Sequence, residues 1–212
     1  MPNFAANLTL MFNEVPFLDR FEVAKDCGFN AVEFLFPYDF SAAEVAEKLQ
    51  KTGQNLALFN LPPGDWDAGD KGMAAIPGRE QEFQDTVGLA LEYARAFKCK
   101  TVHMMAGIIP GVVGVEAAFE TYVTNYQYCA DAFVGDGIDV IIEPLNTRDV
   151  PGYMISKNSS AHSVIAAAGR PNVGLQFDFY HVQIMGGDLA TQFETYLDIT
   201  KHVQIAGVPE RF

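Results

Sequence analysis

Short apolar runs alternate with longer stretches of helical periodicity along the whole chain. The runs are rich in β-branched and aromatic residues and lack steady polar alternation, which is typical of strands covered on both faces of a sheet. Between most runs, apolar residues recur at helical spacing, and Ser41 with Glu44 three residues later predicts a helix start. The predicted strands are residues 4–10, 31–36, 55–61, 100–105, 138–145, 173–179 and 202–206.

Repeated strand and helix units predict a parallel sheet, which is either a barrel or an open, doubly wound sheet. Periodicity alone does not separate these two architectures. A nucleotide-binding doubly wound fold loses its main support because no glycine-rich fingerprint follows the first predicted strand. The length of 212 residues, 49% of them hydrophobic, suits one core, so we expect a single domain over residues 1–212.

The segment 62–79 is polar, glycine-rich and too irregular for a helix. In a barrel, a long loop after a strand usually forms the mouth of the active site. Trp66 is therefore a candidate for the wall of a substrate pocket, and Arg79 is a candidate substrate ligand. The alternatives are a surface loop without function, with Trp66 packed against it and Arg79 in a surface salt bridge.

Acidic residues outnumber basic ones by 27 to 14, which gives a formal net charge of −13. This charge disfavours nucleic acid and anionic membrane surfaces as partners. Cys27, Cys99 and Cys129 are scattered and odd in number, which favours a reducing compartment over a disulfide framework. Without a signal-like first segment or a run of about 18 apolar residues, the sequence predicts a soluble, cytoplasmic protein. Apolar residues on the helices are typical of core packing, which leaves a homo-oligomer open.

Three polar residues interrupt apolar runs near the ends of predicted strands: Glu143, Asp178 and Gln204. Barrel enzymes carry their catalytic side chains at the carboxyl ends of strands. A buried acid without a partner is costly, so two of them ask for hydrogen-bond donors or a cation. Oxygen ligands suit a hard divalent metal such as Mg²⁺ or Mn²⁺, whereas zinc prefers nitrogen and sulfur. The alternative is that both acids form structural ion pairs with Arg or Lys.

Several runs in the same order resemble the hydroxypyruvate isomerase family, which belongs to the xylose isomerase-like barrels. The resemblance covers essentially the whole chain and implies a (β/α)₈ TIM barrel. It implies that Glu143 is the catalytic glutamate and a metal ligand, and that Asp178 and Gln204 are further ligands. His181 resembles a substrate-contacting histidine of related epimerases, although a structural role is the alternative. The runs are residues 28–38, 60–66, 76–80, 142–146, 176–181 and 202–206.

The implied chemistry is the interconversion of hydroxypyruvate and tartronate semialdehyde through an enediol, a reaction of carbohydrate and glyoxylate metabolism. A bound Mg²⁺ or Mn²⁺ would stabilise the developing enediolate, and Glu143 would move the proton. The carboxylate of this small hydroxy-keto acid needs a cation or amide donors. Arg79 and Arg211 are candidates for that role, with surface salt bridges as the alternative for each.

The sequence departs from the family in one respect: the family continues past position 212 through an eighth strand that carries a second glutamate. We therefore expect an incomplete barrel of about seven parallel strands, without the last strand–helix unit and its ligand. This leaves two other readings open, an isomerase or epimerase of another sugar acid or ketose such as 2-oxo-tetronate, and a catalytically inactive binding or interaction protein. An abasic-site nuclease is disfavoured by the net charge of −13 and by the lack of a histidine-rich trinuclear metal pattern.

Overall fold

Seven parallel strands form one curved sheet in the computed structural model, which describes residues 2–211. The strands lie in sequence order, each beside the next, and every adjacent pair is parallel. This confirms the expected incomplete TIM barrel and excludes the doubly wound order. The strands are β1 (Ala5–Asn7), β2 (Ala31–Glu33), β3 (Asn55–Asn60), β4 (Thr101–His103), β5 (Asp139–Ile142), β6 (Val173–Asp178) and β7 (Thr200–Gln204).

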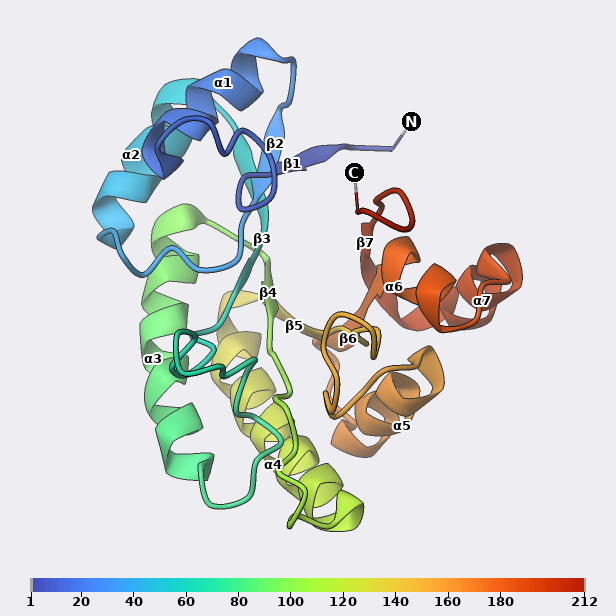
Figure 1. The fold of residues 1–212 in the computed structure, drawn as a ribbon. Coiled ribbons are helices and arrows are strands. Elements are labelled where there is room, and N and C mark those ends of the chain that lie inside the picture. Colours follow the sequence, from blue (N-terminus) through green and yellow to red (C-terminus); the bar gives the residue numbers. More distant parts are fainter. Residues whose placement is uncertain (1, 212) are drawn as a thin grey trace.

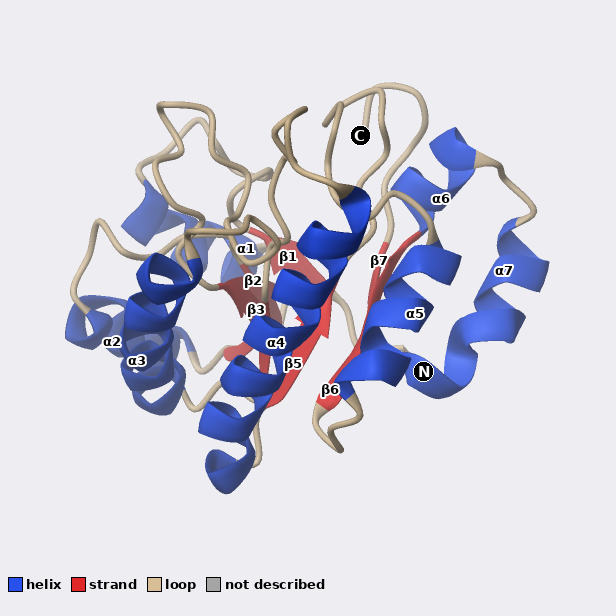
Figure 2. Ribbon diagram, turned by 90° about the horizontal axis from the view of Figure 1, so that it is seen from below, coloured by secondary structure: helices blue, strands red, loops and turns tan. Residues whose placement is uncertain are grey.

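The helices lie outside the curved sheet and connect its strands (Figures 1 and 2). The predicted capping box is confirmed at α2, where the Ser41 hydroxyl accepts a hydrogen bond from the Glu44 backbone and the Glu44 carboxylate accepts one from the Ser41 backbone. The α-helices are α1 (Arg20–Asp26), α2 (Ala42–Thr52), α3 (Glu80–Phe97), α4 (Val115–Phe133), α5 (Asn158–Ala168), α6 (Phe179–Met185) and α7 (Leu189–Tyr196). Three short 3₁₀ helices are Phe17–Asp19, Val134–Asp136 and Leu197–Ile199. No helix among residues 2–211 is long and apolar enough to cross a membrane.

The hydrophobic core lies between the sheet and its helices, and buried tyrosines join the two layers. Tyr126 of α4 donates its hydroxyl hydrogen to the backbone of β5 or β6 and accepts a hydrogen bond from the Gly174 amide. The irregular segment 62–79 forms the β3–α3 loop and contains no helix, as predicted.

Strands β1 and β7 lie at the two ends of the sheet, and neither pairs with a further strand within residues 2–211. Side chains span the opening, since His202 Nε2 on β7 lies 2.7 Å from Glu33 Oε2 on β2. Residues near the N-terminus and residues of β7 line a common groove there. In the β6–β7 register, Asp178 pairs with Gln204, so these two predicted ligands are neighbours at the carboxyl ends of their strands.

Candidate active site

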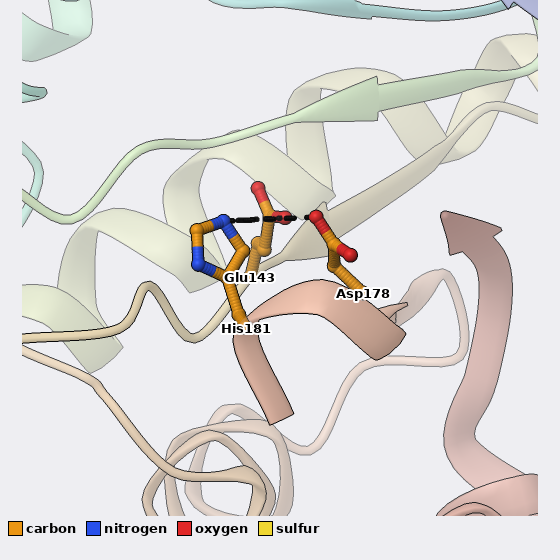
Figure 3. A group of neighbouring side chains, drawn as sticks. All are labelled: Glu143, Asp178 and His181. Carbon is orange, nitrogen blue, oxygen red and sulfur yellow. Dashed lines mark ion pairs between the residues drawn. The ribbon is translucent and has the colours of Figure 1, made fainter. Parts of the chain in front are cut away.

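Glu143, Asp178 and His181 form a buried cluster at the carboxyl ends of β5 and β6 (Figure 3). Glu143 directly follows β5, Asp178 is the last residue of β6, and His181 lies in the first turn of α6. The Nε2 atom of His181 is 3.7 Å from Glu143 Oε1 and 3.6 Å from Asp178 Oδ2. One potential ligand atom from each residue lies within 4.8 Å of the others, a spacing at which all three could face one ion.

Asp178 has two roles because it is both the end of a strand and the N-cap of the following helix. Its Oδ1 atom accepts a hydrogen bond from the Tyr180 backbone N–H at 2.8 Å, which satisfies one free donor of α6. This bond fixes the carboxylate and leaves Oδ2 directed at the cluster, 3.6 Å from His181. The change from strand to helix directly after β6 therefore holds one carboxylate oxygen toward His181.

The cluster holds its acids in a poorly solvated environment. Burial raises the pKa of Glu143 well above its usual value, and the neighbouring carboxylate of Asp178 raises it further. Burial also raises the pKa of Asp178, although the Arg211 guanidinium acts in the opposite direction. Glu143 Oε1 is buried and has no hydrogen-bond partner among the described residues. Positive charge between these two buried carboxyl groups would stabilise their ionised forms.

His181 has a neutral imidazole ring, and a backbone contact on its Nδ1 side sets the orientation of the ring. Burial lowers its pKa to about 3, so its contacts with the two carboxyl groups do not involve an imidazolium. The backbone N–H of Asn146 donates to His181 Nδ1 at 3.1 Å. A neutral imidazole that accepts at Nδ1 carries its hydrogen on Nε2, so His181 presents an N–H donor to the cluster. In this tautomer the ring suits a hydrogen bond to substrate oxygen better than a bond to a metal.

Gln204 lies beside the cluster and has both ends of its amide engaged. Its Oε1 atom accepts a hydrogen bond from Gln176 Nε2 at 2.8 Å. Its Nε2 atom donates to Glu33 Oε1 on the opposite side of the barrel interior. One lone pair of Gln204 Oε1 is not used by these contacts, which leaves the oxygen able to bind a cation.

Arg211 is the predicted substrate ligand that the structure brings to the cluster. Its Nη2 atom lies 3.2 Å from Asp178 Oδ2, and its guanidinium lies over the Tyr180 ring at 4.8 Å from the centroid. A groove of about 410 Å³ reaches Asp178, Gln204 and Arg211 from the open side of the barrel.

The other two predicted substrate residues lie in the β3–α3 loop with partners of their own. Arg79 forms ion pairs at 2.8 Å with Asp70 and 2.6 Å with Glu82. Trp66 packs against Phe36 and carries the Lys71 ammonium 3.4 Å from its ring centroid. Both sets of contacts stabilise the loop, and neither connects it with the carboxylate cluster.

Sequence reasoning missed three polar residues of the barrel interior. Glu33 at the end of β2 is buried beside Gln204, and it interrupts an apolar run in the same way as Glu143. His103 at the end of β4 lies 4.0 Å from Glu143 Oε2, and burial lowers its pKa to about 3. Asn146, three residues after Glu143, orients His181 through its backbone. The position of Glu33 and His103 at strand ends could have identified them from the sequence. Asn146 could not be identified in this way, because its backbone contact with His181 does not depend on residue type.

The residues present fit a hard divalent cation. Glu143 and Asp178 supply anionic oxygens, Gln204 supplies a neutral one on the adjoining strand, and Glu143 Oε1 lacks any partner among residues 2–211. Bound positive charge would reverse the burial effect on both acids and keep them ionised. The geometry therefore supports a metal-assisted acid–base site.

Comparison with known proteins agrees with the fold. The family model of the xylose isomerase-like TIM barrel matches residues 21–212. A 2-oxo-tetronate isomerase from Cupriavidus necator is 47% identical over 211 residues, which are 100% of this chain and 81% of the relative. A hydroxypyruvate isomerase from Escherichia coli is 41% identical over 211 residues, with 100% and 82% coverage.

A crystal structure from Brucella melitensis, described as an AP endonuclease of family 2, superimposes with a TM-score of 0.97. It is 52% identical in sequence, and the match covers 99% of this chain and 81% of that one. The family match, the relatives and the strand order lead to one conclusion. The chain belongs to the xylose isomerase-like TIM-barrel family.

Proposed function

We propose that this protein is a metal-dependent isomerase of short hydroxy-keto acids that interconverts hydroxypyruvate and tartronate semialdehyde (2-hydroxy-3-oxopropanoate). The observation that carries the proposal is the convergence of two buried carboxyl groups, one with an unpartnered oxygen, at the strand ends beside an open groove. Relatives named as isomerases of such acids support the same reaction class.

Glu143, Asp178 and Gln204 are the residues that would hold the metal, which we propose to be Mg²⁺ or Mn²⁺. When bound, the metal stabilises the negative charge that develops on the substrate oxygens as the enediolate forms. Gln204 and Asp178 occupy paired positions on adjacent strands, which supports their action on one ion.

The proton transfer between carbons falls to Glu143, whose carboxylate takes a proton from carbon 3 and returns it to carbon 2, while the hydroxyl hydrogen passes from the oxygen on carbon 3 to the oxygen on carbon 2. The burial of Glu143 beside the proposed metal site supports this role, because the metal would keep the carboxylate ionised and therefore able to accept a proton. His181 donates its Nε2 hydrogen to a substrate oxygen, where charge accumulates in the transition state. His181 is held by the backbone of α6, and Glu143 directly follows β5.

The substrate carboxylate binds to Arg211 in this proposal. Its guanidinium already contacts a carboxylate oxygen of Asp178 at 3.2 Å and lines the groove. A cation with a fork of donors suits a carboxylate group. Of the other sequence candidates, Arg79 is committed to two acids of its own loop and Trp66 to a contact with Lys71, so both are weaker substrate ligands.

The second candidate substrate is 2-oxo-tetronate. Three relatives named 2-oxo-tetronate isomerase are 47%, 43% and 41% identical to this chain, whereas the Escherichia coli relative named hydroxypyruvate isomerase is 41% identical. The same enediol chemistry serves both acids, and a groove of about 410 Å³ has room for either. A nuclease function is disfavoured, despite the description of the Brucella structure, because a net charge of −13 repels a phosphate backbone.

We place this activity in the cytoplasm, with a small acid as the ligand. Free thiols support a reducing compartment, since Cys27 is exposed while Cys99 and Cys129 are buried and none of them forms a disulfide.

The proposal is tested by incubating the protein with hydroxypyruvate or 2-oxo-tetronate, with Mg²⁺, Mn²⁺ or a chelator, and following the product by NMR. We expect metal-dependent turnover that Glu143→Gln reduces by about 10²-fold or more, as for loss of a general base. Glu120→Gln is the matched control, because Glu120 is an exposed residue of α4. Folded protein that binds metal but turns over neither acid would favour the non-catalytic binding role instead.

A further inference from the structure

Glu33 is a buried carboxylate in the barrel interior that accepts hydrogen bonds from side chains on both edge strands. Asn7 Nδ2 on β1 donates to its Oε1 atom at 2.9 Å. His202 Nε2 lies 2.7 Å from its Oε2 atom, and Gln204 Nε2 also donates to Oε1, both from β7. Only 5% of the residue is exposed.

A carboxylate accepts hydrogen bonds and donates none. When a side-chain amide contacts a carboxylate, the contact must therefore be made by the NH₂ end of the amide. The two ends of a glutamine amide are almost identical in shape, and packing alone does not choose between them. At Gln204 the choice is made by Glu33: the NH₂ end faces the carboxylate and the oxygen faces away from it.

The oxygen end of Gln204 points toward β6, where the Gln176 amide donates to it at 2.8 Å. Gln176 and Asp178 lie two residues apart on β6, so their side chains face the same side of the sheet. Gln204 therefore lies between Glu33 and the strand that carries Asp178, with its NH₂ end toward Glu33 and its oxygen toward that strand. Reversing Gln204 would bring an N–H donor to the position of the oxygen, and a donor cannot bind a cation.

We infer that Glu33 is a positioning residue for the cation site: it selects the amide orientation in which Gln204 presents oxygen to the metal. This inference rests on the proposed function, in which Gln204 is a ligand. Glu33 itself needs no contact with the ion, since its effect passes through the Gln204 amide. A partner behind a metal ligand commonly changes metal affinity by 10–100-fold.

Glu33 would also matter if its negative charge attracted the cation directly, or if its hydrogen bonds only stabilised the fold. A double-variant cycle separates these two roles from the orienting role, because replacing Gln204 by glutamate gives a ligand whose two ends are both oxygen. With that ligand there is no orientation left to select.

The experiment measures Mn²⁺ affinity by the EPR signal of the free ion in wild type, Glu33→Gln, Gln204→Glu and the double variant. We expect Glu33→Gln to weaken binding by about 10–100-fold. In the Gln204→Glu background the same change should cost no affinity, because the glutamine introduced on β2 can donate to the carboxylate introduced on β7. A loss of equal size in both backgrounds would assign the effect to charge, and unchanged affinity in Glu33→Gln would overturn the inference outright.

Circular dichroism of the four proteins distinguishes a metal effect from a folding effect. If Glu33→Gln alone does not fold, the double variant is compared with Gln204→Glu, because the double variant still has one amide facing one carboxylate. Lower Mn²⁺ affinity in the double variant than in Gln204→Glu would overturn the inference. NMR of the Gln204 side chain in the metal-free wild type gives an independent readout. We expect slowly exchanging NH₂ protons that shift in Glu33→Gln or, if that variant does not fold, in Glu33→Asp, and rapid exchange in wild type would contradict the assigned orientation.

A failure of the proposed metal site has a different outcome. The proposed metal site would be wrong if wild type bound no Mn²⁺, or if Asp178→Asn bound Mn²⁺ as tightly as wild type. The NMR readout would then still decide whether Glu33 orients the amide.

Discussion

Glu143→Gln should stabilise the protein when metal is absent, and metal should remove most or all of this advantage by stabilising only the wild type. In the metal-free protein the Glu143 carboxylate is buried, and its Oε1 atom has no hydrogen-bond partner among the described residues. Its pKa is raised by burial and by Asp178, so ionisation is less favourable in the folded protein than in the unfolded chain. The wild type therefore loses stability as the pH rises above the ordinary glutamate value of 4.5 and through the raised pKa.

The size of the effect follows from the missing partner. An unsatisfied buried group costs roughly 1–3 kcal/mol, and more when it is charged. For a domain of this size, 1 kcal/mol shifts Tm by roughly 2–4 °C, so the variant should melt roughly 2–12 °C above wild type at pH 8 in chelator. At a metal concentration of about 100 Kd, binding stabilises wild type by about 2.7 kcal/mol, or roughly 5–11 °C, while the variant gains little.

The assay is differential scanning calorimetry of wild type, Glu143→Gln and the control Glu120→Gln at pH 8 and pH 4.5, with chelator or with Mg²⁺. The advantage of Glu143→Gln in chelator should shrink at pH 4.5, because the wild-type carboxyl is then protonated. Glu120→Gln should follow wild type throughout, since this side chain is exposed. A variant that melts below wild type at pH 8 in chelator, or equal Mg²⁺ stabilisation of both, would refute the reasoning.

Three further changes have outcomes that follow from single contacts. Tyr126→Phe removes the buried hydroxyl that bonds the backbone of β5 and β6, and should lower the free energy of unfolding by about 1–3 kcal/mol in urea, whereas Tyr128→Phe at an exposed position should change it by less than about 0.5 kcal/mol. Gly72→Ala should destabilise by at least about 1–3 kcal/mol, because the glycine has φ +100° and its added Cβ would collide with the backbone after β4. Its control is Gly88→Ala in α3, where a Cβ has open space, and this change should instead stabilise by roughly 0.4–1 kcal/mol in the same urea experiment. Arg211→Lys should raise KM for the acid more than it lowers kcat in steady-state assays, since a lysine loses the two-pronged contact with a carboxylate.

Periodicity was sufficient to predict a parallel sheet, because strands covered on both faces form apolar runs and the helices between them have a different period, whereas the choice of a barrel came from the family resemblance. The errors of this prediction lie at strand ends. The last strand begins at Thr200, two residues before the predicted run, because polar Thr200 and Lys201 pair with β6 through their backbone. The first apolar run continues past Asn7, where the strand ends, because the chain turns there and Leu10 N–H bonds back to the Asn7 carbonyl.

The residues of the candidate site that could be predicted are polar residues within apolar, and therefore buried, runs. Glu143 and Asp178 interrupt apolar runs, and the structure places both in one buried cluster. The directions of the side chains were not predictable, because they depend on contacts between residues far apart in the sequence. The Nε2 hydrogen of His181 follows from a backbone group 35 positions away, and the amide of Gln204 is oriented by a residue 171 positions away.

Isotope exchange tests the central claim most directly, because proton abstraction by Glu143 should label the substrate with solvent hydrogen. Hydroxypyruvate would be incubated in D₂O with the protein and Mg²⁺ and followed by ¹H NMR. We predict that deuterium enters at carbon 3 and that tartronate semialdehyde forms, and that both signals are lost with chelator and in Glu143→Gln. Exchange and turnover that persist in the metal-free protein or in the variant would contradict the account.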